Sequence, residues 1–379
     1  MDPEFSLHTE HSVLEIEGKP IGHGSDCYVI AEIGHNHQGS VEQAMQMIAK
    51  AHECGADAVK LQKRDNVSLY TADFYNRPYE SESSFGPTYG MHREALEFGP
   101  VEYRTLKEYA QELGVTFFAT AFDFNSADLL AELDMPAYKI ASGDVVNTPL
   151  LRYVAEIGKP IIFSTGCATL EDVLRAYDAV AEVNEQIVIM QCTAGYPAEW
   201  SELDLGVIRT YGELFPDAVI GFSSHDNGIA MAVAAYVLGA RVIEKHFTLN
   251  RAMKGTDHAF SLEPQGLEKM VRDLQRTRIA LGDGTKSTYP SEVGPAMKMR
   301  KKIVAARDLP AGHCVTPGDL ALKSPGDGLP PYELDRVVGR TLKTPMVADE
   351  ALTFDFLDEV IPQLEEALST EIRVSSNDR

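Results

Sequence analysis

The 379-residue chain lacks three features that would indicate a membrane protein, a secreted protein or a dinucleotide-binding enzyme. A membrane-spanning helix needs about 20 consecutive apolar residues, and runs such as residues 230–238 are far shorter. No basic segment followed by an apolar one opens the chain, so we predict no signal peptide. The pattern GxGxxG, which a dinucleotide-binding fold would place after its first strand, is absent. The chain is therefore predicted to have no membrane partner and no nucleotide-binding domain of that type.

Paired cysteines and a positive charge balance are also missing. The five cysteines have no CxxC spacing, which favours free thiols in a reducing compartment and predicts a cytoplasmic location. The formal net charge of −23 argues against nucleic-acid binding, because that function requires a basic face. An anionic small molecule is still compatible with this charge, since lysines and backbone N–H groups can bind a phosphate locally.

A repeated unit of a short apolar run followed by a helical stretch organises most of the chain. Near-continuous apolar runs suit parallel strands that are covered on both faces by helices. Glycine follows most of the helical stretches, as at a helix C-terminus (Gly55, Gly114, Gly158 and Gly239). Eight such units predict an α/β fold of the (β/α)8 or TIM-barrel type rather than an open sheet. The expected strands are residues 28–34, 58–62, 116–122, 137–142, 160–166, 187–193, 218–225 and 242–248.

Changes in composition predict five segments. The opening sequence MDPEF resembles a vector-derived sequence, and we assign residues 1–20 to an N-terminal extension. The barrel is expected over 21–284, a linker over 285–298, a small domain over 299–360 and an acidic tail, with a final helix, over 361–379. A domain of about 60 residues is marginal alone, so docking onto the barrel or a second subunit is expected. The long connection at residues 64–100 is expected to form a lid or a dimer contact.

Polar side chains end nearly every predicted strand, where barrel enzymes carry their catalytic groups. Lys60 and Lys139 stand inside apolar strands and need anionic partners there. Three interpretations stay open: lysine–glutamate pairs, a phosphate or carboxylate site aided by hydroxyl groups, and a Schiff-base lysine. Two lysines among several hydroxyls favour the anion site.

Two histidines end successive strands, His225 in SSH and His246 in EKHF. On adjacent strands they would lie close enough to share a divalent metal, although a structural role is the alternative. Glu244 and His246 are two residues apart, so both are expected to face the barrel interior. Asp257, in the sequence KGTDH, is a further carboxylate for this site or part of a solvated loop.

Longer motifs make the chain resemble the sialic acid synthase family, whose barrel precedes a small antifreeze-like (SAF) domain. The resemblance covers about residues 28–357. It is carried by AEIGHNHQG (31–39), GADAVKLQK (55–63), YKIASGD (138–144), STG (164–166), QCTAGYP (191–197), IGFSSH (220–225), IEKHFTL (243–249) and KGTDHAFSLEP (254–264). The segment at residues 77–98 resembles the branch that uses N-acetylmannosamine 6-phosphate.

The resemblance implies condensation of phosphoenolpyruvate with N-acetylmannosamine or its 6-phosphate, in a homodimer whose C-terminal domain contacts the partner barrel. It implies three catalytic residues, Glu32, Lys60 and Lys139, and a divalent metal, Mn²⁺ or Mg²⁺, on His225 and His246. Phosphoenolpyruvate would bind Lys60, Thr120, Lys139, Ser142, Ser164 and Ser223, and the sugar would meet Gln62, Tyr196 and Asp257.

Ala194 and Ser324 depart from the pattern of the free-sugar bacterial enzymes, which have Asn and Arg there. The first departure weakens a contact to phosphoenolpyruvate, and the second removes a contact to the N-acyl group. Rival assignments are synthases of legionaminate, pseudaminate, deaminated nonulosonates or spore-coat sugars. A Schiff-base aldolase and a non-enzymatic binding module are further alternatives.

Overall fold

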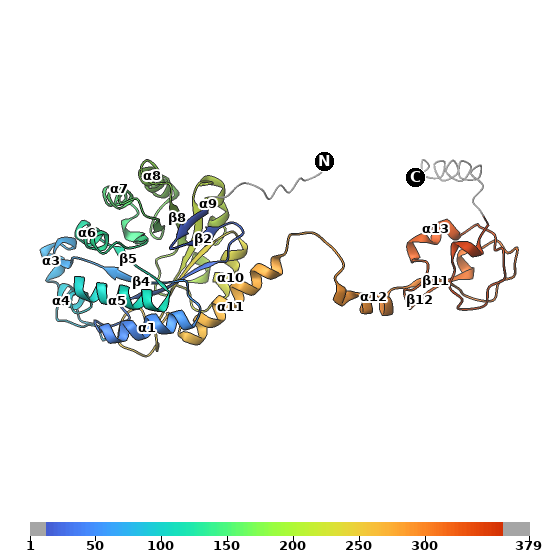
Figure 1. Ribbon diagram of the computed structural model, residues 1–379, viewed down its shortest axis with the longest axis horizontal. Helices are drawn as coiled ribbons and strands as arrows, with labels where there is room; N and C mark the ends of the chain where they lie inside the picture. The colour runs from blue at the N-terminus through green and yellow to red at the C-terminus, as the bar shows by residue number, and fades with distance from the viewer. Residues whose placement is uncertain (1–12, 359–379) are drawn as a thin grey trace. The chain divides into compact units, whose positions relative to one another are not determined.

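Eight parallel strands close into a barrel in the computed structural model, which describes residues 13–358 (Figure 1). Each strand pairs with its neighbours in the sequence, and the last pairs with the first. The strands are β3 (Tyr28–Gly34), β4 (Ala58–Lys63), β5 (Thr116–Ala121), β6 (Tyr138–Ile140), β7 (Ile161–Ser164), β8 (Ile187–Cys192), β9 (Val219–Ser224) and β10 (Val242–His246). All eight expected strands are confirmed, and so is the barrel.

Helices surround the barrel, one or more following each strand (Figure 1). They are α1 (Val41–Glu53), α5 (Pro100–Leu113), α6 (Phe124–Glu132), α7 (Thr148–Ala155), α8 (Leu170–Ala181), α9 (Val207–Leu214), α10 (Ala230–Val237) and α11 (Pro264–Leu281). Gly114 ends α5 in the left-handed conformation, with φ 76°, which glycine adopts without a Cβ penalty. No helix within residues 13–358 is long and apolar enough to span a membrane.

Alternation along each strand separates two cores. Residues such as Val29, Val59 and Phe117 face the helices and form the larger core. The barrel interior is filled by apolar residues on or next to the eight strands, such as Ile30, Phe118 and Ile162. Because side chains on a strand alternate, the next inward residue towards the carboxyl end is two positions further on. On six of the strands that position is polar (Glu32, Lys60, Thr120, Lys139, Ser164 and Glu244), so the apolar interior carries a polar layer at one end.

A hairpin packs against the apolar interior of the barrel. It consists of β1 (Val13–Ile16) and β2 (Lys19–Gly22), which pair antiparallel. Leu14, Ile16 and Ile21 join the same cluster of buried residues as the barrel interior. The segment that we assigned to an extension therefore contributes to the core from Leu14 onwards. Residues 1–12, including the MDPEF sequence, lie outside the described part.

The long connection after β4 folds into three short helices. These are α2 (Asn66–Leu69), α3 (Ala72–Tyr75) and α4 (Tyr89–Glu94). An antiparallel bridge between Pro78 and Thr88 ties the loop between α3 and α4 together. Tyr79 and Tyr89 pack ring to ring with centroids 5.5 Å apart. This connection is therefore an ordered structure beside the barrel.

The chain divides into two units, Met1–Gly282 and Asp283–Arg379. The second contains η3 (Pro290–Glu292), α12 (Val293–Met299), β11 (Lys302–Ala305), η4 (Pro317–Asp319), β12 (Leu320–Lys323), η5 (Pro331–Glu333), α13 (Leu334–Val337) and η6 (Phe354–Phe356). Its small core gathers apolar residues including Ile303, Val315 and Leu342. The stretch expected to be a linker contains η3 and most of α12. The predicted acidic tail and its helix lie outside the described residues.

Candidate active site

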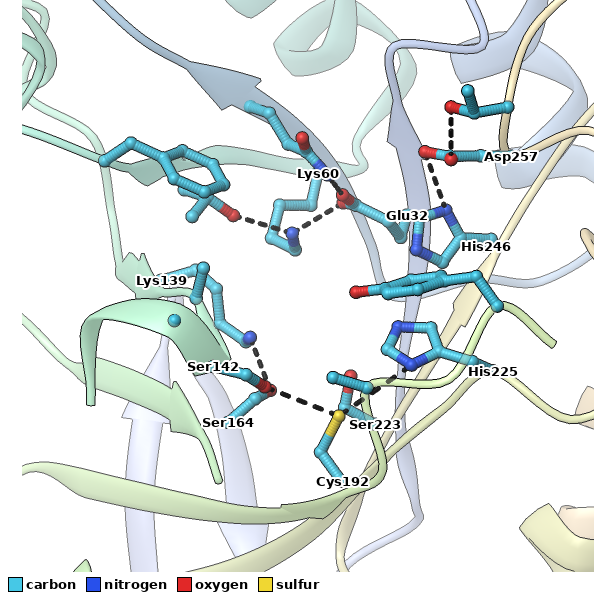
Figure 2. Close-up of a pocket in the computed structure, with 18 of the residues that line it drawn as sticks. Glu32, Lys60, Lys139, Ser142, Ser164, Cys192, Ser223, His225, His246 and Asp257 are labelled. Carbon is cyan, nitrogen blue, oxygen red and sulfur yellow. Dashed lines mark hydrogen bonds and ion pairs between the residues drawn. The ribbon is translucent and has the colours of Figure 1, made fainter. Parts of the chain in front are cut away.

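A cavity of about 570 Å³ opens at the carboxyl ends of the barrel strands. Every residue predicted for the site lines it (Glu32, Lys60, Gln62, Thr120, Lys139, Ser142, Ser164, Tyr196, Ser223, His225, His246 and Asp257). Figure 2 shows side chains from different strands converging on one space. The barrel thus brings together residues that are more than 200 positions apart in the sequence.

Lys60 is held at the base of the cavity by a carboxylate and a hydroxyl group. Its Nζ lies 2.6 Å from Oε2 of Glu32 and donates to Oγ1 of Thr120 at 2.8 Å (Figure 2). Gln62 Nε2 donates to the other oxygen of Glu32 at 2.6 Å. These residues lie on β3, β4 and β5, which are neighbours in the barrel. The lysine–glutamate pair that the sequence left open is therefore present.

Lys139 has a second set of partners across the cavity. Its Nζ donates to Oγ of Ser164 at 2.6 Å and lies 3.9 Å from Oε1 of Glu244. The same oxygen of Glu244 is 3.7 Å from Nζ of Lys60 and accepts from Oγ of Ser223 at 3.4 Å. Glu244 therefore links the two lysines, and it faces the cavity as the alternation in β10 predicted.

Burial and charge act in opposite directions on these groups. Burial raises the pKa of Glu32, with Lys60 opposing the shift and Glu244 adding to it. Burial also favours a raised pKa at Glu244, but Lys139 and Lys60 outweigh it and hold that pKa below its usual value. The pKa of Lys139 is lowered by burial, against the pull of Glu244. Two neighbouring carboxyls with pKa values pushed apart are typical of a catalytic site.

The ring of Tyr196 stands beside the two histidines. Its centroid is 4.3 Å from that of His225 and 6.5 Å from that of His246, and the two imidazoles are 5.4 Å apart. Asp257 reaches the same place, with Oδ2 3.8 Å from Nδ1 of His246. Burial would raise the pKa of Asp257, but His246 and Thr256 lower it. Asp257 thus faces the cavity instead of solvent.

The donor set of the two histidines fits a divalent cation. Nδ1 of His225 lies 2.8 Å from the backbone oxygen of Thr193, the contact that directs the other ring nitrogen of a metal-bound histidine. Nδ1 of His246 is buried and has no hydrogen-bond partner within residues 13–358. In that same part of the chain, no three His, Cys, Asp or Glu side chains cluster as a complete metal site. An ion here would complete its coordination with substrate or water.

Several lining residues were not predicted for the site. Arg64, Tyr79, Tyr89 and Arg93 form the wall that the long connection contributes. Arg64 continues the inward alternation of Lys60 and Gln62, a signal that was available in the sequence. The other three follow turns and short helices, where no periodicity indicates which side chains face inward.

The two departures from the family pattern occupy different units. Ala194 lines the cavity, so the position is at the site although its side chain can make no hydrogen bond. Ser324 belongs to the C-terminal unit, where its Oγ accepts from Nζ of Lys301 at 2.8 Å.

A (β/α)8 barrel with buried lysines, glutamates and two histidines at the carboxyl ends of its strands is typical of an enzyme. The NeuB family model matches residues 47–286, and the SAF domain model matches residues 300–358. The chain therefore belongs to the NeuB family and carries a C-terminal SAF domain. It is an enzyme of the transferase class, a synthase that forms a carbon–carbon bond.

Named relatives cover nearly the whole chain. The N-acetylneuraminate-9-phosphate synthase of Homo sapiens is 38% identical over 91% of this chain and 97% of its own. The N,N'-diacetyllegionaminic acid synthase of Legionella pneumophila is 34% identical over 90% and 97%. Among solved structures, an N-acetylneuraminic acid (sialic acid) synthetase from Leptospira borgpetersenii in complex with citrate is 30% identical. It covers 75% of this chain and 95% of that one, with a TM-score of 0.66.

Proposed function

We propose that this enzyme condenses phosphoenolpyruvate with N-acetylmannosamine or its 6-phosphate and releases phosphate. The product is N-acetylneuraminate or its 9-phosphate. One observation carries the proposal: a single cavity holds two buried lysines with adjacent hydroxyl groups, two buried glutamates and two histidines. The likeness to the human synthase supports this choice of substrates.

Phosphoenolpyruvate is assigned to the lysine side of the cavity. Lys60 and Lys139 supply two ammonium groups for its phosphate and carboxylate, and Thr120, Ser142, Ser164 and Ser223 supply hydroxyl donors. Gly166 N–H donates to Oγ of Ser142 at 3.0 Å, which orients that hydroxyl at the wall of the cavity. Charge-assisted hydrogen bonds of this kind are about twice as strong as neutral ones. Binding of the anion would loosen the pairs that the lysines now make with Glu32 and Glu244.

The sugar is assigned to the histidine side. Its open-chain aldehyde is placed near His225 and His246, while Gln62, Tyr196 and Asp257 meet its hydroxyl and amide groups. A Mn²⁺ or Mg²⁺ ion bound by the histidines would polarise the aldehyde as a Lewis acid. Confining both substrates in one cavity removes much of the entropic cost of bringing two reactants together.

We assign Glu32 to the reacting carbons, between the lysine side and the histidine side of the cavity. C3 of phosphoenolpyruvate attacks the aldehyde carbon, and positive charge develops at C2. A buried carboxylate beside C2 stabilises that charge or removes a proton from the water that adds there. The resulting tetrahedral carbon then expels phosphate by cleavage of its C–O bond. The raised pKa of Glu32 brings it nearer to the range of a general base.

Quaternary structure and location complete the proposal. A homodimer is proposed in which the SAF domain of one subunit reaches the barrel of the other. The support is the small size of that domain, since a core of so few residues gains stability from docking. All five cysteines are unpaired, which is consistent with a reducing compartment such as the cytoplasm.

Phosphate release from phosphoenolpyruvate in the presence of Mn²⁺ tests the proposal. N-acetylmannosamine, its 6-phosphate and mannose 6-phosphate are compared, each with and without EDTA. We expect turnover with an N-acetylmannosamine substrate that stops when EDTA removes the metal. Turnover only with the sugars that lead to legionaminate or pseudaminate would reassign the enzyme within its family. If borohydride instead links pyruvate covalently to the enzyme, and EDTA has no effect, the enzyme is a Schiff-base aldolase.

A further inference from the structure

Two arginines stand at the outer wall of the cavity. Arg64 follows the end of β4 and is 6% exposed, and Arg93 lies on α4 in the long connection. Both line the cavity. The guanidinium of Arg64 stacks on the ring of Phe122 at 3.6 Å, which holds it in place.

Carboxylates near these two guanidinium groups are too few to neutralise them. Glu97 is 4.0 Å from Nη1 of Arg64, and the same carboxylate also accepts from Nζ of Lys63 at 3.1 Å. Within residues 13–358, Arg93 forms no ion pair with a carboxylate, and its Nε and Nη2 donate to the hydroxyl of Tyr89. The two lysines at the base of the cavity, by contrast, each face a glutamate.

His35 contacts both arginines, and hydrogen-bond donors outnumber acceptors around its ring. Its Nε2 is 3.1 Å from Nη1 of Arg64 and 3.4 Å from Oε1 of Glu97, and its Nδ1 is 3.1 Å from Nη1 of Arg93. A neutral imidazole has one N–H and one acceptor nitrogen, whereas a guanidinium can only donate. Burial and the two arginines lower the pKa of His35 well below its usual value, so it stays neutral. One arginine N–H therefore faces another donor, an arrangement that an oxyanion between the two guanidiniums would relieve.

We propose that Arg64 and Arg93 bind the phosphate group of a sugar phosphate, which makes the phosphorylated sugar the preferred second substrate. This inference rests on the proposed function. Planar guanidinium groups match the geometry of a phosphate, and each of them can bind it through two parallel hydrogen bonds.

The place of Arg64, directly after the end of β4, agrees with this assignment. Lys60, Gln62 and Arg64 alternate with outward residues, so they line the cavity at successive heights. At roughly 3.3 Å per residue, the Cα atoms of Lys60 and Arg64 are about 13 Å apart along the strand. Gln62 connects the two levels, because it donates to Glu32 and accepts from Nη2 of Arg64 at 2.7 Å. The reacting end of the sugar would lie near Glu32 and its phosphorylated end near the arginines.

Arg93→Gln tests the inference when kcat/KM is measured with N-acetylmannosamine 6-phosphate and with N-acetylmannosamine. Hydrogen bonds to charged groups predict a loss of roughly 10- to 100-fold for the phosphorylated sugar. The unphosphorylated sugar should change by less than about threefold, and KM for phosphoenolpyruvate should not change. Arg64→Gln is expected to act in the same direction. Equal losses for both sugars, or no loss for either, would overturn the assignment.

Two controls separate this result from misfolding. Arg93→Lys keeps the positive charge and should retain part of the preference for the phosphorylated sugar, although lysine cannot bind a phosphate bidentately. Arg175→Gln removes an arginine on the surface of α8 and should change neither sugar. Thermal unfolding of each variant shows whether the barrel is intact.

Sugar binding measured by calorimetry tests the inference even if the proposed reaction is wrong. When wild type releases no phosphate from phosphoenolpyruvate with either sugar, the proposed function fails. Tighter binding of N-acetylmannosamine 6-phosphate than of N-acetylmannosamine, lost in Arg93→Gln, would still uphold the arginine site. Equal binding of the two sugars by wild type would overturn it.

Discussion

Glu32 and Lys60 are paired in register on neighbouring strands, and their charged groups meet 2.6 Å apart with side chains 1% and 2% exposed. Removing two charges from water costs several kcal/mol per ion, and their attraction repays this only when the geometry is favourable. Such a buried pair contributes little net stability, and its place in the cavity makes it a candidate for a functional role. The pair therefore links the stability of the barrel to the catalytic role that we propose for Glu32 and Lys60.

Lys60→Met should destabilise the barrel by about 3–5 kcal/mol, because it leaves a buried carboxylate without its nearest cation. The double variant Lys60→Met/Glu32→Gln should recover part of this loss, since the uncompensated charge is gone. Unfolding in urea measures both. Lys159→Met is the matched control, because Lys159 pairs with Asp134 on the surface and should contribute at most about 1 kcal/mol.

The stability of the Lys60→Met variant should also depend on pH. A carboxyl whose folded-state pKa is raised holds its proton more tightly in the folded protein than in the unfolded one. Stability therefore falls as the pH rises from the ordinary glutamate pKa to the raised pKa of Glu32. Loss of Lys60 raises that pKa further, so Lys60→Met should be less stable at pH 8 than at pH 5, relative to wild type. A difference that does not depend on pH would contradict the buried-charge explanation.

Lys139→Ala should abolish turnover, since it removes one of the two cations assigned to phosphoenolpyruvate. Burial lowers the pKa of Lys139, so wild-type kcat/KM for phosphoenolpyruvate should decline with rising pH below the usual lysine range. Steady-state rates across pH 7 to 10 measure this, with the surface variant Lys50→Ala as a control. Near-wild-type rates in Lys139→Ala would remove this residue from the catalytic assignment.

His225→Ala and His246→Ala should each weaken Mn²⁺ binding by roughly 100-fold, because even partners outside the coordination shell contribute 10- to 100-fold. Equilibrium dialysis with Mn²⁺ measures the affinity without depending on turnover. His52→Ala, on the exposed face of α1, should bind as wild type does. Unchanged Mn²⁺ binding in both cavity variants would indicate that these histidines have a structural role.

Much of the barrel follows from the sequence, because alternation and apolar runs determine which strand residues face inward. Lys60 and Lys139 could be identified as special from the cost of burying a lysine in such a run. The resemblance to a known family added roles for hydroxyl groups such as Ser142, whose position in a turn carries no periodic signal. The histidines were expected to lie close together, and their ring centroids are 5.4 Å apart.

Contacts between distant segments explain what the sequence did not reveal. The VLEI strand at residues 13–16 alternates, but only packing against the barrel interior shows that Leu14 and Ile16 belong to the core. Arg93 lines the cavity and contacts His35, which follows β3 in the chain, and nothing in the residues next to Arg93 predicts that position. Likewise, the 64–100 connection could be expected to be functional from its length, although its three short helices could not.

Asp319 provides a test in the SAF domain, away from the barrel. It is buried and receives hydrogen bonds from Arg307 Nη2 at 2.5 Å, Thr316 N–H at 2.9 Å and Thr316 Oγ1 at 2.7 Å, and it faces Nε2 of His313 at 2.8 Å. These contacts, led by the one with His313, hold the pKa of Asp319 far below its usual value. A depressed carboxyl pKa stabilises the folded state above the ordinary aspartate pKa, and this stabilisation is lost as the pH falls towards the folded-state value.

Asp319→Asn should therefore destabilise the SAF domain by about 2 kcal/mol at pH 7 and by progressively less in acid. Amide hydrogen exchange in the full chain resolves this domain from the barrel and measures the effect at both pH values. Asp327→Asn is the matched control, because Asp327 forms an exposed pair with Lys302 that should contribute little. If Asp319→Asn exchanges like wild type at pH 7, the network around Asp319 does not stabilise the domain. Faster exchange in the barrel as well would show that the two units are coupled in stability, as docking of the SAF domain onto a barrel requires.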